Sequence, residues 1–133
     1  EDVTFTRTPA MWNQGYTLLA QTYYTLLAMD LLDKMHLEIF NAIHLKRRNI
    51  RSPEDMAEFL SELGVDPLAF VKVFNSFGVT SSLRMADARG RAYRATGVPT
   101  LIVQGKYRIE AGSAGSTQEM LKVAEYLIDL ERQ

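Results

Sequence analysis

The chain has 133 residues, of which 47% are apolar and 23% are charged, and its formal net charge is −1. This length is typical of one domain, and the apolar share is too high for an intrinsically disordered chain. The near-neutral charge argues against a protein that coats nucleic acid or an acidic membrane surface. Cysteine is absent, which excludes a disulfide, a thiolate metal site and a cysteine nucleophile from these residues.

The N-terminal residues have the pattern of a β-strand. Residues 3–8 are rich in β-branched side chains and alternate, which places Val3, Phe5 and Arg7 on one face. A long stretch of helical pattern separates this strand from the next strand-like segment. Because an unpaired strand edge promotes aggregation, we expect this strand to pair with sheet partners that are missing from these 133 residues.

Five helices are expected in the middle of the chain. The first begins after the capping residue Asn13, and Asp33 is expected to cap the second. Ser52 and Asp66 each precede a proline, a combination typical of a helix start. The residues expected to face inward on the second helix are Leu37 (or His36), Ile39, Phe40 and Ile43.

Two glycines are expected to end helices. Gly64 follows the helix that begins after Ser52, and Gly97 follows a long, polar-faced helix over about residues 79–95. Glycine readily adopts the left-handed backbone conformation with which many helices end.

The hydrophobic period changes in the last third of the chain. Residues 100–109 have the pattern of a β-hairpin, with its turn at 105–106. Residues 111–115 are expected to form a flexible loop. Ser116 and Glu119 have the spacing of a capping box, which predicts a final helix.

The most pointed local feature is the junction Val98–Pro99 at the entrance to the hairpin. Proline lacks the backbone N–H that a central strand uses, so it belongs at the start of a strand. A cis bond here would turn the N–H and C=O of Val98 outward, where they can pair with an extended peptide. The alternative is a trans proline that simply begins a strand, which is the commoner form of such bonds.

Several segments resemble the DsbA family of thiol:disulfide oxidoreductases. Thr-Gly-Val-Pro-Thr at residues 96–100, with Leu-Ile-Val after it and Gly-Lys-Tyr-Arg at 105–108, is similar to the family's cis-proline loop and hairpin. Phe-Asn-Ser-Phe at 74–77 and Ser-Pro-Glu-Asp-Met at 52–56 resemble its helical segments, and residues 121–132 resemble its last helix. The resemblance covers essentially the whole chain.

The resemblance implies an α/β protein with an incomplete thioredoxin-like fold: a strand, a helical insertion domain, a β-hairpin and a C-terminal helix. The implied domains are a thioredoxin-like strand at 1–12, a helical insertion domain at 13–78, a connecting helix at 79–95 and a C-terminal thioredoxin-like ββα portion at 96–133. Family members carry a Cys-X-X-Cys motif at the start of their first helix. By the family's order of elements we expect this motif upstream of Glu1, so the departure resembles truncation and not replacement of the cysteines.

The resemblance also implies the site residues. Val98 and Pro99 match the substrate-binding positions of the family, and no residue of this chain is expected to be catalytic. Arg7 matches a basic strand residue that would tune a thiol pKa electrostatically; the alternative is a charge merely exposed to solvent. We expect no cofactor, and no metal site, because His36 and His44 lack further ligands at a suitable spacing.

The implied parent protein is a periplasmic thiol:disulfide interchange protein that introduces disulfides into secreted proteins. This chain alone is expected to be inactive. The implied partners are reduced substrate polypeptides and a membrane quinone-linked reoxidase, with no nucleic acid. Exposed sheet edges are expected to favour association or swapping of the fragment.

Two alternatives stay open. Kappa-class glutathione transferases and isomerases also carry Gly-Val-Pro-Thr, but they usually follow it with an acidic and aromatic hairpin and a Gly-x-Asp, where this chain has Lys-Tyr-Arg and Gly-Ser-Ala-Gly. The second alternative is a non-catalytic helical binding module in which Val98–Pro99 is only a turn. Glutathione binding would favour the first alternative, and a trans bond at Pro99 the second.

Overall fold

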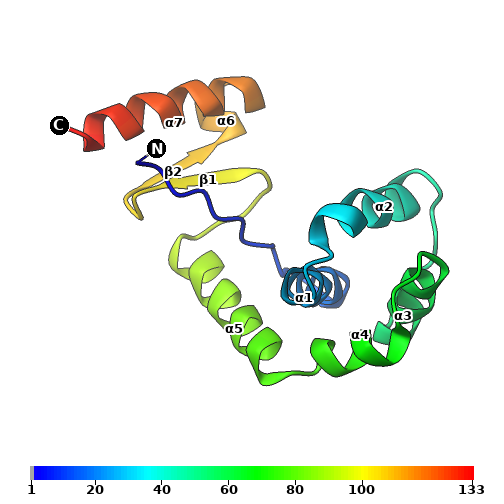
Figure 1. The fold of residues 1–133 in the computed structure, drawn as a ribbon. Coiled ribbons are helices and arrows are strands. Elements are labelled where there is room, and N and C mark those ends of the chain that lie inside the picture. Colours follow the sequence, from blue (N-terminus) through cyan, green and yellow to red (C-terminus); the bar gives the residue numbers. More distant parts are fainter. Residues whose placement is uncertain (1) are drawn as a thin grey trace. The chain divides into compact units, whose positions relative to one another are not determined.

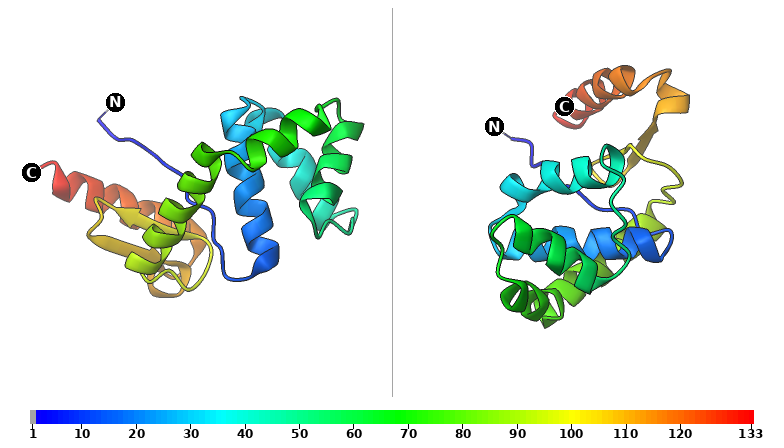
Figure 2. Two further views of the ribbon diagram at one scale, coloured as in Figure 1. Left: turned by 90° about the horizontal axis from the view of Figure 1, so that it is seen from below. Right: turned by 90° about the vertical axis from the view of Figure 1, so that its right-hand side faces the viewer.

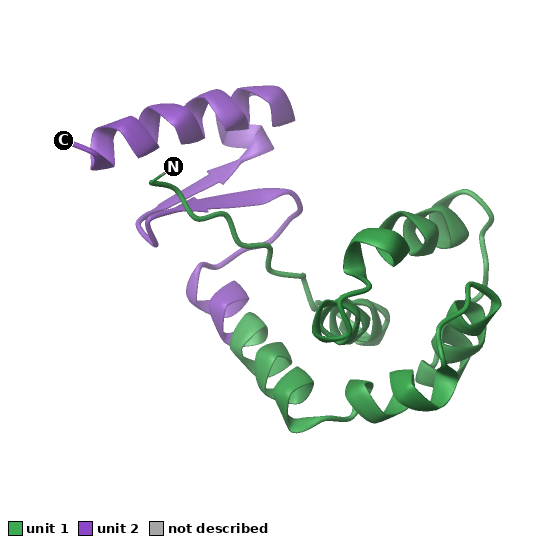
Figure 3. Ribbon diagram, in the orientation of Figure 1, with its two compact units in different colours: residues 1–87 green, residues 88–133 purple. Residues whose placement is uncertain are grey.

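The computed structural model describes residues 2–133, and the chain forms two compact units (Figure 3). The first unit ends at Asp87, and the second comprises Ala88–Gln133. The elements are, in order, α1 (Gln14–Ala28), α2 (Leu32–His44), α3 (Pro53–Glu62), α4 (Pro67–Phe74), α5 (Phe77–Ala92), β1 (Thr100–Val103), β2 (Tyr107–Glu110), α6 (Ala111–Ala114) and α7 (Thr117–Glu131). Among the described residues, no helix combines the length and the apolar character that a membrane crossing requires. The division into four domains inferred from the sequence stays a prediction.

The first unit is built around α1. This helix packs against α2 and α4, and α3 packs against α4; Figure 1 shows α1 end-on with α2, α3 and α4 curving around it. The most completely buried apolar side chains of this core are Leu26, Met56, Leu60 and Phe70. Removal of these side chains from water provides the main stabilisation of the unit.

Three helix starts of this unit agree with the sequence pattern. Asn13, Ser52 and Asp66 are confirmed as caps, because each side chain accepts a hydrogen bond from a backbone N–H in the first turn of its helix. Ser52 and Asp55 form a reciprocal capping box. Gly64 follows α3 with a φ of 90°, which confirms it as the left-handed residue that ends this helix.

The second helix differs from its predicted form. Its N-cap is Leu31, which provides no side-chain hydrogen bond, so the expectation that Asp33 caps it is wrong. Ile39 is buried as expected, but Leu37 and Phe40 are 62% and 51% exposed. The buried residues of α2 are Met35, Ile39 and Ala42. This helix carries two apolar stripes of regular spacing, and only packing against α1 decides which stripe is buried.

The strand predicted at residues 3–8 is not formed. Among the described residues the sheet consists of β1 and β2 alone, and Val3 and Phe5 are 51% and 72% exposed. An alternating pattern becomes a strand only where a neighbouring strand pairs with its backbone. The predicted association through exposed sheet edges stays a prediction.

The second unit is a hairpin covered by helices. β1 and β2 are antiparallel, with Thr100 opposite Glu110 and Val103 opposite Tyr107, and α6 and α7 pack against them (Figure 2). The turn is centred on Gln104 and Gly105, so it begins one residue before the predicted 105–106. The φ angles of these two residues are 54° and 68°, which agrees with the positive φ of tight hairpin turns. The buried residues of this unit's core are Val103, Ile109 and Met120.

Residues 111–115 are not the flexible loop that the sequence predicted. They contain the single-turn helix α6, closed by a hydrogen bond of 2.9 Å from the Gly115 N–H to the Ala111 carbonyl. Ser116 then caps α7 by accepting a hydrogen bond from the Glu119 N–H at 3.1 Å, as expected. Small residues close together allow a turn of helix as well as a loop, so composition alone did not decide between them.

Candidate substrate-docking site

The helix that leads to the predicted site ends with a left-handed residue that is not glycine. Arg94 has a φ of 53°, and the Ala95 N–H donates to the Gly90 carbonyl at 3.1 Å, the bond that defines a Schellman helix end. The expectation that Gly97 ends this helix is therefore wrong, because the chain turns before it. The turn leaves residues 95–99, here called the entry loop, to connect α5 to β1.

Val98 and Pro99 lie in the exposed part of the entry loop. The bond between them is cis, which agrees with one of the two possibilities left open by the sequence. Both residues are exposed, and Val98 retains 68% of its accessible surface. Within residues 2–133 the backbone N–H and C=O of Val98 make no hydrogen bond. An incoming main chain can therefore pair with these groups without displacing an internal bond.

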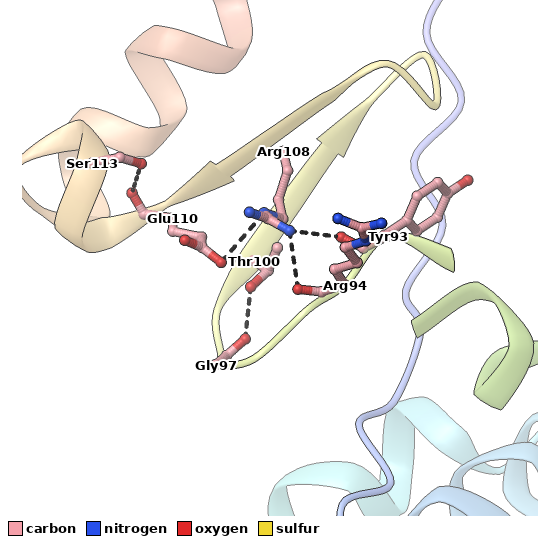
Figure 4. A network of polar contacts seen from close by, with 7 residues as sticks. All are labelled: Tyr93, Arg94, Gly97, Thr100, Arg108, Glu110 and Ser113. Carbon is pink, nitrogen blue, oxygen red and sulfur yellow. Dashed lines mark hydrogen bonds and ion pairs between the residues drawn. The ribbon is translucent and has the colours of Figure 1, made fainter. Parts of the chain in front are cut away.

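The C-terminal end of the entry loop is fixed by the first residue of β1. The Thr100 hydroxyl donates to the carbonyl oxygen of Gly97 at 2.6 Å, as Figure 4 shows. This contact spans Val98 and Pro99 and closes the loop over three residues. The exposed dipeptide is thus attached directly to a strand whose register is set by β2.

The N-terminal end of the entry loop is fixed by β2. Arg108 Nη1 donates to the carbonyl oxygens of Tyr93 and Arg94, at 3.1 Å and 3.0 Å (Figure 4). Arg108 Nε also lies 3.5 Å from Glu110 Oε1, so the guanidinium is held between a carboxylate and two carbonyls. Carbonyl oxygens at the C-terminus of a helix carry partial negative charge, and a cation there is favourable.

Lys106 and Glu131, the groups of the second unit whose pKa values are shifted, meet at the other end of the hairpin. Lys106 Nζ donates to Glu131 Oε2 at 2.6 Å, and the Tyr107 hydroxyl donates to Glu131 Oε1 at 3.2 Å. The Lys106 hydrogen bond, and with less effect the Tyr107 hydroxyl, hold the pKa of the Glu131 carboxyl below its ordinary value. The same hydrogen bond raises the pKa of Lys106. These contacts tie the turn of the hairpin to α7.

The third residue predicted for the site belongs to the other unit. Arg7 is exposed, and its guanidinium carbon lies 6.0 Å from the ring centroid of Phe5. Val98 and Pro99 are neighbours in the entry loop, and the substrate-binding role predicted for them stays a prediction, as does the role of Arg7. Within residues 2–133, no three His, Asp or Glu side chains gather where they could hold a metal ion.

Sequence reasoning missed the role of Arg108. The residue entered only as part of the Gly-Lys-Tyr-Arg segment, because its partners are main-chain carbonyls 14 and 15 positions earlier. Every residue has a backbone carbonyl, so the residue types do not indicate which carbonyl oxygens accept a hydrogen bond. The available indication was a lone basic residue in the middle of a short strand.

A helical unit followed by a hairpin and a C-terminal helix is a partial thioredoxin-like fold, and comparison with known proteins agrees. Residues 1–125 match the profile of the DSBA-like thioredoxin domain. Over 132 residues the chain is 44% identical to the thiol:disulfide interchange protein DsbA of Azotobacter vinelandii, and over 131 residues it is 41% identical to that of Pseudomonas aeruginosa. A crystal structure of Pseudomonas aeruginosa DsbA superimposes with a TM-score of 0.91 at 41% identity, covering 98% of this chain and 68% of that one.

The chain belongs to the DSBA-like thioredoxin-domain family. It spans 62% of the length of the Azotobacter and Pseudomonas relatives, while 99% and 98% of this chain is matched. A DsbA from Klebsiella pneumoniae, 17% identical with a TM-score of 0.80, shares the fold. The predicted family and the predicted incomplete thioredoxin-like fold are confirmed; the strand at residues 3–8 is the part of that fold prediction that is wrong.

Proposed function

We propose that the whole protein is a periplasmic thiol:disulfide interchange enzyme that introduces disulfides into secreted proteins. The observation that carries this proposal is the 41–44% identity to DsbA proteins over nearly the whole chain. This chain contributes the helical unit and the entry loop, which binds the substrate. Because it contains no cysteine, it is inactive on its own.

The redox chemistry requires a pair of cysteines outside these 133 residues. Following the order of elements in the family, we assign a Cys-X-X-Cys motif to a segment upstream of Glu1. A substrate thiolate attacks the enzyme disulfide to form a mixed disulfide, and a second substrate thiolate then displaces the enzyme cysteine. The substrate gains a disulfide, the enzyme becomes a dithiol, and a membrane quinone-linked reoxidase takes up its two electrons.

The entry loop binds the substrate chain beside the cysteines. The Val98 N–H and C=O pair with an extended peptide in the manner of an added strand. The exposure of Val98 and its unpaired backbone groups within residues 2–133 support this assignment. Pro99, the residue after Val98, has no backbone N–H, so it does not compete with the Val98 N–H for the hydrogen-bond acceptors of the peptide. Arg7 acts through its positive charge on the thiol pKa, and an Arg7→Gln variant should raise that pKa.

Oxidation of a peptide dithiol by the whole protein tests this function. The wild-type protein should oxidise the peptide, and Val98→Lys should raise the KM for it about tenfold, the effect of about 1.4 kcal/mol of lost binding. Val71→Lys is the matched control, since Val71 is an exposed valine of α4 in the other unit. Oxidation by the isolated 133-residue chain, or no oxidation by the whole protein, would contradict the proposal.

A further inference from the structure

Arg108 of β2 contacts the chain just after the end of α5 through its guanidinium. Among the described residues of β2, no other charged side chain makes this contact. In the hairpin register it lies opposite Ile102, so its backbone is in the middle of the hairpin and away from the loop. Its side chain therefore spans the distance to the carbonyl oxygens of Tyr93 and Arg94. These carbonyls lie just after the end of α5, so no backbone N–H of the helix donates a hydrogen bond to them.

The guanidinium is itself held in one orientation. Glu110 lies on the same strand, opposite Thr100, and its carboxylate is 3.5 Å from Arg108 Nε. One guanidinium thus has a carboxylate on its Nε side and two carbonyls on its Nη1 side (Figure 4). A planar group with several fixed donors suits this arrangement, whereas a lysine ammonium is a single point on a flexible stem.

The two ends of the entry loop are consequently fixed by one hairpin. Arg108 fixes the chain at Arg94, and Thr100 fixes it at Gly97 through the 2.6 Å hydrogen bond. Val98 lies between Gly97 and the start of β1 and stays exposed. A loop fixed before it binds a peptide loses less conformational freedom on binding, and this favours affinity.

We propose that Arg108 is a positioning residue that holds the entry loop in its peptide-binding conformation. The inference rests on the proposed function of the loop, and it assigns to Arg108 no contact with the substrate or with the reacting sulfurs. Its effect is specific to substrates that bind along the main chain. A small dithiol that needs no strand pairing does not depend on it.

The test compares two substrates in the whole protein, with its cysteine-bearing segment in place. Arg108→Gln should raise the KM for a peptide dithiol about tenfold through loss of the charge-assisted hydrogen bonds. Oxidation of dithiothreitol should stay within about twofold of wild type, because that reagent reaches the cysteines without binding the loop. Arg108→Lys, which retains the charge but not the fork, should recover part of the lost peptide affinity.

Lys106→Gln is the matched control. It also removes one cation of the hairpin that pairs with a glutamate, but its partner is Glu131 on α7 and not the entry loop. It should leave the KM for the peptide unchanged. If Arg108→Gln and Lys106→Gln give the same KM, or if Arg108→Gln slows dithiothreitol and peptide equally, Arg108 has no positioning role. A wild-type protein that oxidises neither substrate would instead overturn the proposed function.

Discussion

Gln21 of α1 donates a hydrogen bond from Nε2 to the main-chain carbonyl oxygen of Phe74, at a distance of 2.8 Å. Phe74 is the last residue of α4, so its carbonyl lies among the helix-end acceptors that have no partner within the helix. The bond joins segments that are 53 positions apart in the chain. It therefore fixes the position of α4 on the central helix of the first unit.

Gln21→Leu should destabilise the first unit by about 1–2 kcal/mol, because the partly buried Phe74 carbonyl loses its donor. Urea-induced unfolding of the 133-residue chain, followed by circular dichroism, measures this change. Gln14→Leu is the control, since Gln14 is exposed at the start of the same helix. Equal stability of the two variants would show that the hydrogen bond contributes nothing.

The second prediction concerns the contribution of the α3 cap to stability. The Ser52 hydroxyl accepts a hydrogen bond from the Asp55 N–H at 3.0 Å, so Ser52→Ala should cost about 1 kcal/mol of unfolding free energy. Ser61→Ala provides the comparison within the same helix, since the Ser61 hydroxyl donates to the carbonyl of Glu58 in the last turn and caps nothing. A loss at Ser61 as large as that at Ser52 would argue against the capping role.

The carboxylate of Asp55 makes stability depend on pH. Hydrogen bonds from the backbone N–H of Arg51, and with less effect from Ser52, hold the pKa of Asp55 below its ordinary value. A group with a lowered folded-state pKa stabilises the protein above its unfolded-state pKa, and this stabilisation is lost as the pH falls through the folded-state pKa.

Asp55→Asn should accordingly be less stable than wild type at neutral pH, and the difference should shrink as the pH is lowered below about 4. Thermal unfolding between about pH 7 and about pH 3 measures the difference. Glu54→Gln removes a neighbouring charge from the same first turn but leaves the Asp55 hydrogen bonds in place. A difference that is constant over this pH range would contradict the assigned cause.

Two glycine substitutions should act in opposite directions. Gly64 has a φ of 90°, so Gly64→Ala should destabilise the chain by about 1 kcal/mol even though the added Cβ would meet nothing within 4 Å. Gly90 lies within α5, and a Cβ there also meets nothing within 4 Å. Gly90→Ala should therefore stabilise α5 by up to about 1 kcal/mol. Melting temperatures that fall for both variants would contradict the conformational explanation.

The helix starts with a side-chain cap could be predicted from the sequence because their chemistry is local. Ser52 and Asp66 lie within three residues of the N–H groups from which they accept hydrogen bonds. The strand at residues 3–8 and the inner face of α2 depend instead on what lies beside them. An alternating segment forms the backbone hydrogen bonds of a strand only where another strand lies beside it. The two apolar stripes of α2 are equivalent in the sequence, and packing against α1 decides which of them is buried.

The candidate site was predictable only in part for the same reason. Val98 and Pro99 could be predicted as site residues because a proline at a strand entrance is a local pattern, which the family resemblance supports. Arg94 was missed because arginine carries no preference for a left-handed φ, and the bonds of the helix end hold it there. Arg108 was missed because its partners are backbone atoms distant in the chain.

Sequencing of the gene immediately upstream of the codon for Glu1 examines whether this chain is the substrate-docking part of a disulfide-forming enzyme. We expect a continuous reading frame that encodes a strand followed by a Cys-Pro-His-Cys-like motif at the start of a helix. A stop codon or an unrelated sequence at that place would show that the chain has no such parent enzyme.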